Sequence, residues 1–302
     1  MMVAFIVGLI VAGLSSQPIL ILLRKLKSEQ TINAHVQEHA HKQGTPTMGG
    51  LMILVAIVAA AVMGWSDRVI SPLLVTLGFG VIGFVDDYVV PKMMPGTRGL
   101  GWKQKLALEF LICGGACWLA GFHEPKSIAI AIFMILFYSN AYNFSDGIDG
   151  LAATIGIFLT LGMMIVTHDQ GPLMPGLMAG FFVFLYYNRH PAKVFMGDVG
   201  ALPIGALLGW YAFLLVQSPP VAPTAGYWVG GVLLSLVMLI EIIPPPLQVF
   251  YYKLTKKRIF PKTPIHHSFQ IAGWPENRIV ALFAGLQMLG TIGAIALMGG
   301  AK

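Results

Sequence analysis

The segment "IAIAIFMILFYSNAYNFSDGIDGLAATIGIFLTLGMMIV", residues 128–166, contains two apolar runs joined by a polar stretch. Each run approaches the length of about 20 mostly apolar residues that a helix needs to cross the hydrocarbon core of a bilayer. Between the runs, Asn140, Asn143, Asp146 and Asp149 are spaced three residues apart. The pattern predicts two membrane helices joined by a polar connection at the membrane surface.

The rest of the chain has the same apolar character. Of its 302 residues, 56% are hydrophobic and only 11% are charged, and the mean hydropathy is +0.76, which is outside the range of ordinary soluble domains. We therefore predict an all-α polytopic membrane protein in which residues 1–302 form a single domain with about ten transmembrane helices. The ten apolar segments cover residues 3–23, 48–64, 69–85, 105–122, 127–142, 150–167, 173–188, 200–217, 226–243 and 279–299.

The distribution of positive charge predicts the orientation. Of the 19 Lys and Arg residues, all but Arg68, Lys126 and Lys302 lie in the connections, or at the helix ends, that follow odd-numbered segments. Because cytoplasmic loops of membrane proteins are enriched in Lys and Arg, these connections should be cytoplasmic and both termini should be on the outer, periplasmic or extracellular side. The loop carboxylates and the adjacent histidines belong to the same connections, so an active site is expected at the cytoplasmic face.

The polar quartet cannot line one face of a straight helix. An α-helix turns about 100° per residue, so positions three apart drift by about 60° at each step. Gly147 and Gly150 indicate a break instead, with one helix ending near Asp146 and another beginning near Asp149, so that the polar groups line one pocket. The alternative is that Asp146 and Asp149 only terminate and cap the two helices.

A glycine-rich turn, "HKQGTPTMGG" at residues 41–50, precedes the second apolar segment. Glycines that lead into a helix N-terminus can offer backbone N–H groups to a phosphate, which makes Lys42 and Thr47 candidate substrate-binding residues. The ordinary alternative is a loop in which a threonine caps the helix.

The stretch "FVDDYVV", residues 84–90, places Asp86 and Asp87 at the expected C-terminus of the third segment. Carboxylates are unfavourable at that end of the helix dipole, so a divalent cation or a basic neighbour such as Lys92 or Lys105 should offset their charge. The alternative is a solvated helix end.

Two later stretches complete the polar inner face: "NRHPAKVFMGDVGALPIG" at residues 188–205 and "RIFPKTPIHHSFQIAGW" at residues 258–274. The first sets Asp198 between Gly197 and Gly200, where a carboxylate can approach a ligand without crowding. The second presents His266 and His267, which could bind a metal, transfer protons or simply be surface residues.

Carboxylates that bind Mg²⁺, together with Lys and Arg that bind phosphates, are typical of phosphoryl transfer. Nucleic-acid binding is not indicated, because membrane topology already explains most of the positive charge.

The motifs "GTPTMGG", "FVDDY", "NAYNFSDGIDGLA", "HPAKVFMGDVGAL" and "PIHH" resemble, in the same order, those of the phospho-N-acetylmuramoyl-pentapeptide transferase family. This family belongs to the wider polyprenyl-phosphate N-acetylhexosamine-1-phosphate transferases. The resemblance implies an Mg²⁺-dependent enzyme of the bacterial plasma membrane that acts on UDP-MurNAc-pentapeptide and undecaprenyl phosphate. Its products would be lipid I, which is undecaprenyl-pyrophosphoryl-MurNAc-pentapeptide, and UMP. It also suggests a homodimer.

The resemblance further implies roles for individual residues. Asp198 corresponds to the family's Mg²⁺ ligand, with Asp87 and Asp146 as further candidate ligands, and Asp86 and Asp87 correspond to the catalytic Asp pair. Lys105, His266 and His267 correspond to catalytic groups near the pyrophosphate. The substrate-binding positions would be Lys42, Thr47, Asn143, Asp146, Asp149, Asn188, Phe195 and Gly197, with Phe195 stacking on uracil and Asp149 reading it.

Several positions depart from the family pattern. Ser268 stands where a third histidine is usual, Gln270 where a glutamate is usual, and Val90 where a lysine is usual. Pro244, Pro245 and Pro246 fall within the expected ninth helix and predict a break there. The departures keep open a sister transferase that uses UDP-GlcNAc. An ion-coupled transporter is the remaining alternative, suggested by Glu109 and Glu241 inside apolar segments.

Overall fold

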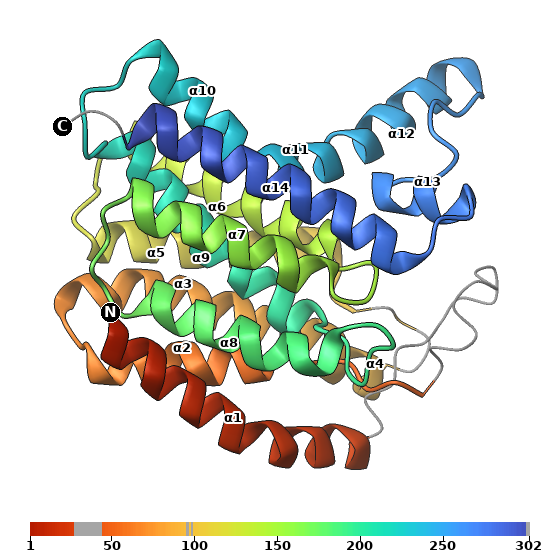
Figure 1. Cartoon of the computed structure of the whole chain (residues 1–302), viewed down its shortest axis with the longest axis horizontal. Coiled ribbons are helices and arrows are strands. Elements are labelled where there is room, and N and C mark those ends of the chain that lie inside the picture. Colours follow the sequence, from red (N-terminus) through yellow and green to blue (C-terminus); the bar gives the residue numbers. More distant parts are fainter. Residues whose placement is uncertain (27–43, 95–96, 98, 300–302) are drawn as a thin grey trace.

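The computed structural model describes residues 1–26, 44–94, 97 and 99–299, and within these ranges it contains helices and no β-strand (Figure 1). The helices are α1 (Met2–Lys25), α2 (Leu51–Met63), α3 (Asp67–Phe84), α4 (Val90–Met93), α5 (Trp102–Leu119), α6 (Pro125–Ser145), α7 (Leu151–Val166), α8 (Leu173–Asn188), α9 (Asp198–Gln217), α10 (Ala225–Leu234), α11 (Leu236–Ile242), α12 (Pro244–Thr255), α13 (Ile265–Ile271) and α14 (Glu276–Met298), and a π-helical turn, η2 (Val85–Val89), lies between α3 and α4.

The length and composition of the helices indicate a polytopic membrane protein. Five described helical stretches are long and apolar enough to cross a membrane: Met2–Lys25, Asp67–Met93, Pro125–Ser145, Asp198–Gln217 and Glu276–Met298. The stretch Ala225–Thr255 would be a sixth span, although it bends by 61° at a break. Three further apolar helices, α2, α7 and α8, are shorter. Each of the ten segments predicted from the sequence is helical, while the structure supports five or six full spans by length.

Helix α9 is the centre of the bundle and packs against α3 and α6. Its close contact with α6 depends on small residues, because a Cβ atom at Gly205 would come within 2.5 Å of the Ser139 backbone. The Ser139 hydroxyl donates a hydrogen bond to the backbone oxygen of Leu202, 3.1 Å away. Small residues and short polar links of this kind are common where membrane helices pack closely.

The predicted break in the polar quartet is confirmed. Helix α6 ends at Ser145, Asp146 follows with a non-helical backbone, and α7 begins at Leu151 after Gly150, whose φ is +79°. A left-handed φ of this kind suits glycine because glycine has no Cβ.

The Asp pair does not end its helix as the sequence suggests. Asp86 and Asp87 lie in the π-helical turn η2, and the helix continues through α4 to Met93. Pro91 has no N–H to bond a carbonyl of the preceding turn, and the π-helical turn lies directly before α4. Single π-helical turns within α-helices are frequent at functional sites.

The break expected at the three prolines is small, and the main bend lies elsewhere. The prolines begin α12, where their missing N–H groups are tolerated, and only Ile243 separates α12 from α11. The 61° bend lies at Ser235, between α10 and α11. The Ser235 hydroxyl donates to the backbone oxygen of Gly231, a contact that commonly bends helices, and it also bonds to the Tyr138 hydroxyl of α6.

Figure 1 shows the long helices lying side by side. Met1 and the C-terminal end of α14 are at one end of the bundle, and α4, α12 and α13 are at the other. This second end also carries the N-terminus of α9 and the turn between α6 and α7. The candidate site residues that the structure describes therefore gather at the end of the bundle opposite to Met1.

Candidate active site

Lys105 of α5 joins two of the predicted carboxylates. Its ammonium nitrogen is 2.8 Å from Asp198 Oδ2 and 3.4 Å from Asp86 Oδ2. All three side chains are about a fifth exposed, at 23%, 24% and 15% respectively. The cluster is thus shielded from bulk water yet open to a ligand, and its charge interactions are stronger than at a free surface.

The local fold holds Asp86 and Asp87 in different ways. The Leu100 N–H donates to Asp86 Oδ1 at 2.6 Å, which ties the carboxylate to the segment before α5. The Val199 N–H donates to Asp87 Oδ2 at 3.2 Å, which ties that carboxylate to the first turn of α9. The π-helical turn therefore presents the two adjacent carboxylates to two neighbouring elements.

Asp198 occupies the first position of α9 and also contacts α6. The Asn143 amide donates to Asp198 Oδ1 at 2.7 Å, while Lys105 donates to the other oxygen. Gly197 comes before it with φ +71°, and a Cβ there would lie 2.6 Å from Asp87 Oδ2 and 2.7 Å from Thr47 Oγ1. Only glycine therefore fits the turn that brings Asp87, Asp198 and Thr47 together.

The donor set of this cluster fits Mg²⁺. Two carboxyl groups, those of Asp86 and Asp198, pair with Lys105, and a third, that of Asp87, is bonded to the N–H of Val199, the residue that follows Asp198. Carboxylate oxygen is the ligand type that Mg²⁺ prefers, and Mg²⁺ commonly completes its coordination with water and phosphate. The residues present can therefore hold a divalent cation beside a phosphate group.

Asp149 lies in a second cluster, together with two residues that the sequence analysis missed. Its Oδ2 atom is 3.0 Å from His190 Nδ1 and accepts a hydrogen bond from the Ala192 N–H at 3.0 Å. The Asp149 N–H donates to Glu276 Oε2, which is itself 3.6 Å from His190 Nδ1. Asp149, His190 and Glu276 could together hold a metal ion. Asp149 is only 3% exposed, and the N-cap residue of α7 is Gly150.

Asn188 links two of the connecting segments. Its Oδ1 accepts from the Gly150 N–H at 3.0 Å, and its Nδ2 donates to the Val194 backbone oxygen at 2.9 Å. The side chain is 2% exposed. Asn188 therefore fixes the turn before α7 against the segment that leads into α9.

His266 is completely buried and bonded to Glu241 of α11. His266 Nδ1 is 2.8 Å from Glu241 Oε2, and both side chains have no exposed surface. The other side-chain atoms of the pair, His266 Nε2 and Glu241 Oε1, have no hydrogen-bond partner among the described residues. His266 Nε2 faces the turn after α6, because a Cβ on Gly147 would lie 2.1 Å from it. The histidine segment and the polar quartet thus come into direct contact.

His267 is half-buried, and its Nδ1 is 2.7 Å from Gln270 Oε1. Phe195 is also half-buried, and its backbone is fixed by bonds from its N–H to Pro46 O and from the Gly49 N–H to its own oxygen. Lys42 lies outside the described residues. The structure therefore brings Thr47, the Asp pair, Lys105, Asn143 and Asp198 together, and it brings His266 to the polar quartet.

Relatives with curated names match nearly the whole chain. Phospho-N-acetylmuramoyl-pentapeptide-transferase from Staphylococcus epidermidis is 35% identical over 88% of this chain and 89% of its own length. The enzyme of the same name from Picosynechococcus sp. is 37% identical over 93% of this chain and 82% of its own length. That from Moorella thermoacetica is 32% identical over 97% of both chains.

The chain belongs to the phospho-N-acetylmuramoyl-pentapeptide-transferase family.

Family models match two parts of this transferase. Glycosyl transferase family 4 matches residues 69–216, which include the Asp pair, Lys105, the polar quartet and Asp198. Phospho-N-acetylmuramoyl-pentapeptide-transferase signature 1 matches residues 42–54, the glycine-rich turn and the start of α2. Both matches cover elements that meet at the carboxylate cluster.

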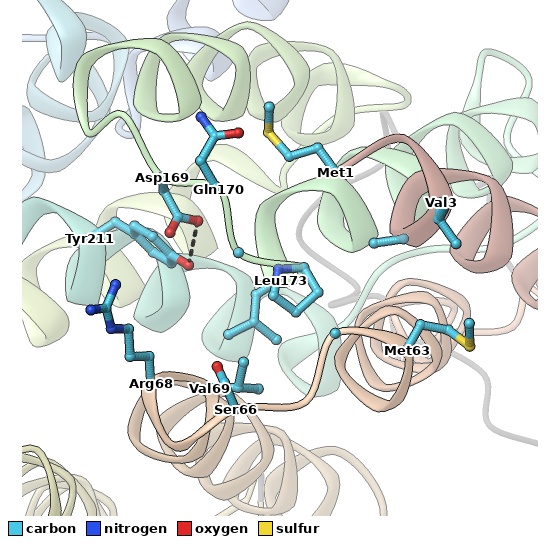
Figure 2. A pocket seen from close by; sticks show the side chains of 14 residues that line it. Met1, Val3, Met63, Ser66, Arg68, Val69, Asp169, Gln170, Leu173 and Tyr211 are labelled. Atoms are coloured by element: carbon cyan, nitrogen blue, oxygen red, sulfur yellow. Dashed lines mark hydrogen bonds between the residues drawn. The ribbon is translucent and has the colours of Figure 1, made fainter.

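A cavity of about 370 Å³ lies at the other end of the transferase. Figure 2 shows Met1, Arg68, Asp169 and Tyr211 around it, with the Tyr211 hydroxyl donating to Asp169 Oδ2 at 3.0 Å. Tyr211 and Asp198 are on the same helix, thirteen residues apart, which corresponds to about 20 Å along the axis. The cavity is therefore separate from the carboxylate cluster.

Two residues of the site could not be found from motif spacing. His190 is part of the quoted segment "NRHPAKVFMGD", but nothing in the sequence shows that it faces Asp149. Glu276 is the first residue of α14 and lies far from Asp149 in the chain. The sequence indicates only that both residues lie in connections on the same side of the membrane, as the distribution of Lys and Arg predicts.

Proposed function

We propose that the chain transfers phospho-MurNAc-pentapeptide from UDP-MurNAc-pentapeptide to undecaprenyl phosphate, with lipid I and UMP as products. Membership of the transferase family supports this reaction. At the level of individual residues, the main support for this reaction is the cluster in which Lys105 bonds to both Asp86 and Asp198. A group of carboxylates around a lysine suits a reaction whose substrates are phosphates bound with Mg²⁺.

In this reaction a phosphate oxygen of undecaprenyl phosphate attacks the phosphorus that bears the sugar. The bond from that phosphorus to the bridging oxygen breaks, and UMP leaves with the bonding electrons. The second pKa of a phosphate monoester is about 6, so the acceptor is mostly a dianion at neutral pH and gains little from a general base. Asp86 and Asp87 would therefore orient the acceptor and the cation, and Lys105 would offset negative charge that develops on the leaving phosphate.

Mg²⁺, when bound, would neutralise phosphate charge and help to align the reacting groups. Asp198 is the proposed principal ligand, with Asp87 and Asp146 as further candidates. His267 would face the pyrophosphate, and His266 would hold the turn at Gly147 in place. These assignments are supported by the contacts of Asp198 with Lys105 and Asn143 and by the proximity of Gly197 to Asp87.

The proposed nucleotide site lies beside this cluster. Phe195 would stack on uracil, while Asn143, Thr47 and Gly197 would line the donor phosphates and Lys42 would contact the nucleoside. The buried contacts of Asp149 and Asn188 support a role for both in shaping the wall of this site. Asp149 would then help to bind uracil indirectly, by fixing the turn that precedes α7.

An alternative mechanism makes Asp87 the general base. The pH dependence of the Asp87→Asn variant separates the two mechanisms. A rate reduced by one constant factor at every pH supports orientation by Asp87. Loss of the acidic limb of the profile supports proton transfer by Asp87 and contradicts our proposal.

We also propose a single membrane domain with ten crossings, in which both ends of the chain are outside and the carboxylate cluster is at the cytoplasmic face of the bacterial plasma membrane. The distribution of Lys and Arg supports this topology. Labelling of single cysteines in cells tests it. A cysteine at Lys257 should react only after the inner membrane is opened, and one at Pro220 should react in intact spheroplasts. A homodimer, suggested by resemblance, is tested by light scattering in detergent.

Release of UMP by the purified protein tests the reaction. The assay contains Mg²⁺ and undecaprenyl phosphate and receives either UDP-MurNAc-pentapeptide or UDP-GlcNAc. We expect UMP and lipid I only with the first donor. UMP from UDP-GlcNAc alone would support the sister transferase, and no UMP from either would contradict the proposed function.

The matched control for this assay is Asp169→Asn, which makes the same chemical change at the opposite end of the bundle as Asp198→Asn makes in the cluster. We expect full activity from the first variant and none from the second. A transporter is disfavoured because the carboxylates of the candidate site gather at one end of the bundle and Glu241 is bonded to His266.

A further inference from the structure

A chain of hydrogen bonds connects the histidine segment to the turn before α7. His267 Nδ1 is 2.7 Å from Gln270 Oε1, and Gln270 Nε2 donates to Glu276 Oε1 at 3.3 Å. The second oxygen of Glu276 accepts the Asp149 N–H at 3.2 Å. The chain thus runs from α13 to the start of α14 and on to the wall of the proposed nucleotide site.

The chemistry of these groups determines the direction of each bond. An ionised carboxylate only accepts hydrogen bonds, and Glu276 already receives one from the Asp149 backbone. Gln270 must therefore turn its NH₂ group toward Glu276, which leaves its carbonyl oxygen toward His267. A carbonyl oxygen cannot donate, so the His267 Nδ1 atom must carry the hydrogen.

We propose that Gln270 is a positioning residue that holds His267 in the Nδ1–H tautomer and fixes the orientation of its ring. In a neutral ring of this tautomer, Nε2 carries the lone pair. The role of the ring in catalysis rests on the proposed function, whereas the tautomer does not.

The bond to Gln270 also limits rotation of the imidazole. The ring of His267 lies against that of His266, with centroids 4.1 Å apart and planes at 54°. His266 is itself held by Glu241. The contact with His266 restricts one face of the ring and the bond to Gln270 restricts its edge, so that Nε2 has a defined direction. A group that acts on a phosphate needs such a fixed direction, because small displacements are costly in rate.

The alternative is that Gln270 only helps α13 to pack against α14. A packing role predicts that any substitution in the chain lowers stability, with no specific effect on the histidine. The positioning role predicts a change of tautomer when the residue on the far side of Gln270 is changed. The variant Glu276→Gln tests this, because Glu276 is linked to His267 through Gln270.

In Glu276→Gln the Asp149 N–H still needs an acceptor, so the new amide should turn its oxygen toward Asp149 and its NH₂ toward Gln270. Gln270 should then rotate, with its oxygen toward residue 276 and its NH₂ toward His267. The NH₂ group needs an acceptor, so Nδ1 should lose its hydrogen and Nε2 should gain it. The positioning role therefore predicts an inverted tautomer at His267.

The double variant Gln270→Glu with Glu276→Gln should restore the original tautomer. The carboxylate at position 270 accepts from both neighbours, from the amide at 276 and from His267 Nδ1. All hydrogen bonds of the chain are then satisfied, with the negative charge moved one residue closer to the ring. In the single variant Gln270→Glu, two carboxylates would face each other at a position where the present atoms are 3.3 Å apart.

Nitrogen-15 NMR of protein labelled at histidine, recorded at alkaline pH where histidine is neutral, distinguishes the two tautomers. The His267→Gln variant assigns the signal. We expect Nδ1–H in the wild type and in the double variant, and Nε2–H in Glu276→Gln. A wild-type Nε2–H tautomer, or the same tautomer in wild type and Glu276→Gln, overturns the proposal.

Steady-state kinetics give a second result. Glu276→Gln should reduce kcat on the order of tenfold with a much smaller change in KM, and the double variant should recover most of this loss. Glu124→Gln, the same change as Glu276→Gln but at an exposed position at the start of α6, is the matched control and should leave kcat unchanged. If the tautomer inverts while the wild type releases no UMP, the positioning role stands and the proposed function fails.

Discussion

Gly147→Ala tests the contact between the polar quartet and His266. A Cβ atom at residue 147 would lie 2.1 Å from His266 Nε2 and 2.7 Å from its Cε1. Ordinary contacts of a Cβ begin at 3.4 Å, so the ring would have to retreat by about 1.3 Å. Its own environment opposes this movement, because His266 is fully buried and bonded to Glu241.

The expected cost has two parts. Overpacking a well-filled interior typically costs about 1–3 kcal/mol of stability. A displacement of about 1 Å near reacting groups can reduce the rate on the order of 100-fold. We therefore expect Gly147→Ala to lower the melting temperature in detergent and to lower kcat for UMP release by roughly that factor, which corresponds to about 2.7 kcal/mol of activation free energy.

Gly115→Ala is the control, because a Cβ atom there meets no atom within 4 Å and the residue lies inside α5. It should keep both the melting temperature and kcat. In a His266→Ala background the steric conflict is absent, so Gly147→Ala should not lower the melting temperature further, although His266→Ala itself leaves Glu241 buried without its partner and should not restore kcat. Wild-type stability and kcat in Gly147→Ala would refute the reasoning, since His266 could not then occupy the place that the structure gives it.

Three further predictions concern the two ends of the bundle. Asp198→Ala should reduce UMP release to the background rate while the protein still elutes as a folded species in gel filtration, and ordinary activity would contradict the proposed role of Asp198 as a ligand. Removal of divalent cations with EDTA should stop UMP release, and added Mg²⁺ should restore it; turnover that persists in EDTA would exclude the proposed dependence on Mg²⁺. Asn188→Ala leaves two buried backbone groups without their partner and should cost on the order of 2 kcal/mol in thermal or denaturant unfolding; equal melting of Asn188→Ala and wild type would show that its two hydrogen bonds are not formed. Tyr211→Phe, at the cavity near Met1, is the control for kcat and should leave it unchanged.

The helical breaks show what local sequence can and cannot predict. The break between Asp146 and Asp149 follows from the three-residue spacing and from Gly150, and the structure confirms it. The sequence wrongly suggested that a helix ends at the Asp pair, because a run of polar residues cannot distinguish a terminus from a π-helical turn. The main bend of the ninth segment was also misplaced, because it depends on packing at Ser235 and not on the prolines.

The candidate site also contains residues that the sequence predicted and residues that only the fold reveals. Motifs predicted Asp198 and Lys105, and the structure joins their side chains directly. His190, Glu241 and Glu276 acquire their partners only through the packing of segments far apart in the chain. Glu241 illustrates the reason. From the sequence alone, a glutamate inside an apolar segment suggests an ion-binding group, whereas in the structure it is bonded to His266, which is distant in the chain. The role of a residue that departs from the family pattern, such as Gln270, can be inferred only when its neighbours in the structure are known.

Helix α9 is enclosed by the rest of the bundle, whereas some helices near the candidate site are not. Most of α9 is buried, whereas α12 has a single buried residue, Pro244, and projects from the bundle beside α13 (Figure 1). We therefore expect Asp198 to keep its place during turnover and the peripheral helices to adjust to substrates of different size. An inhibitor that binds through Asp198 would meet the same geometry in every state, while one that binds α12 or α13 would select a conformation.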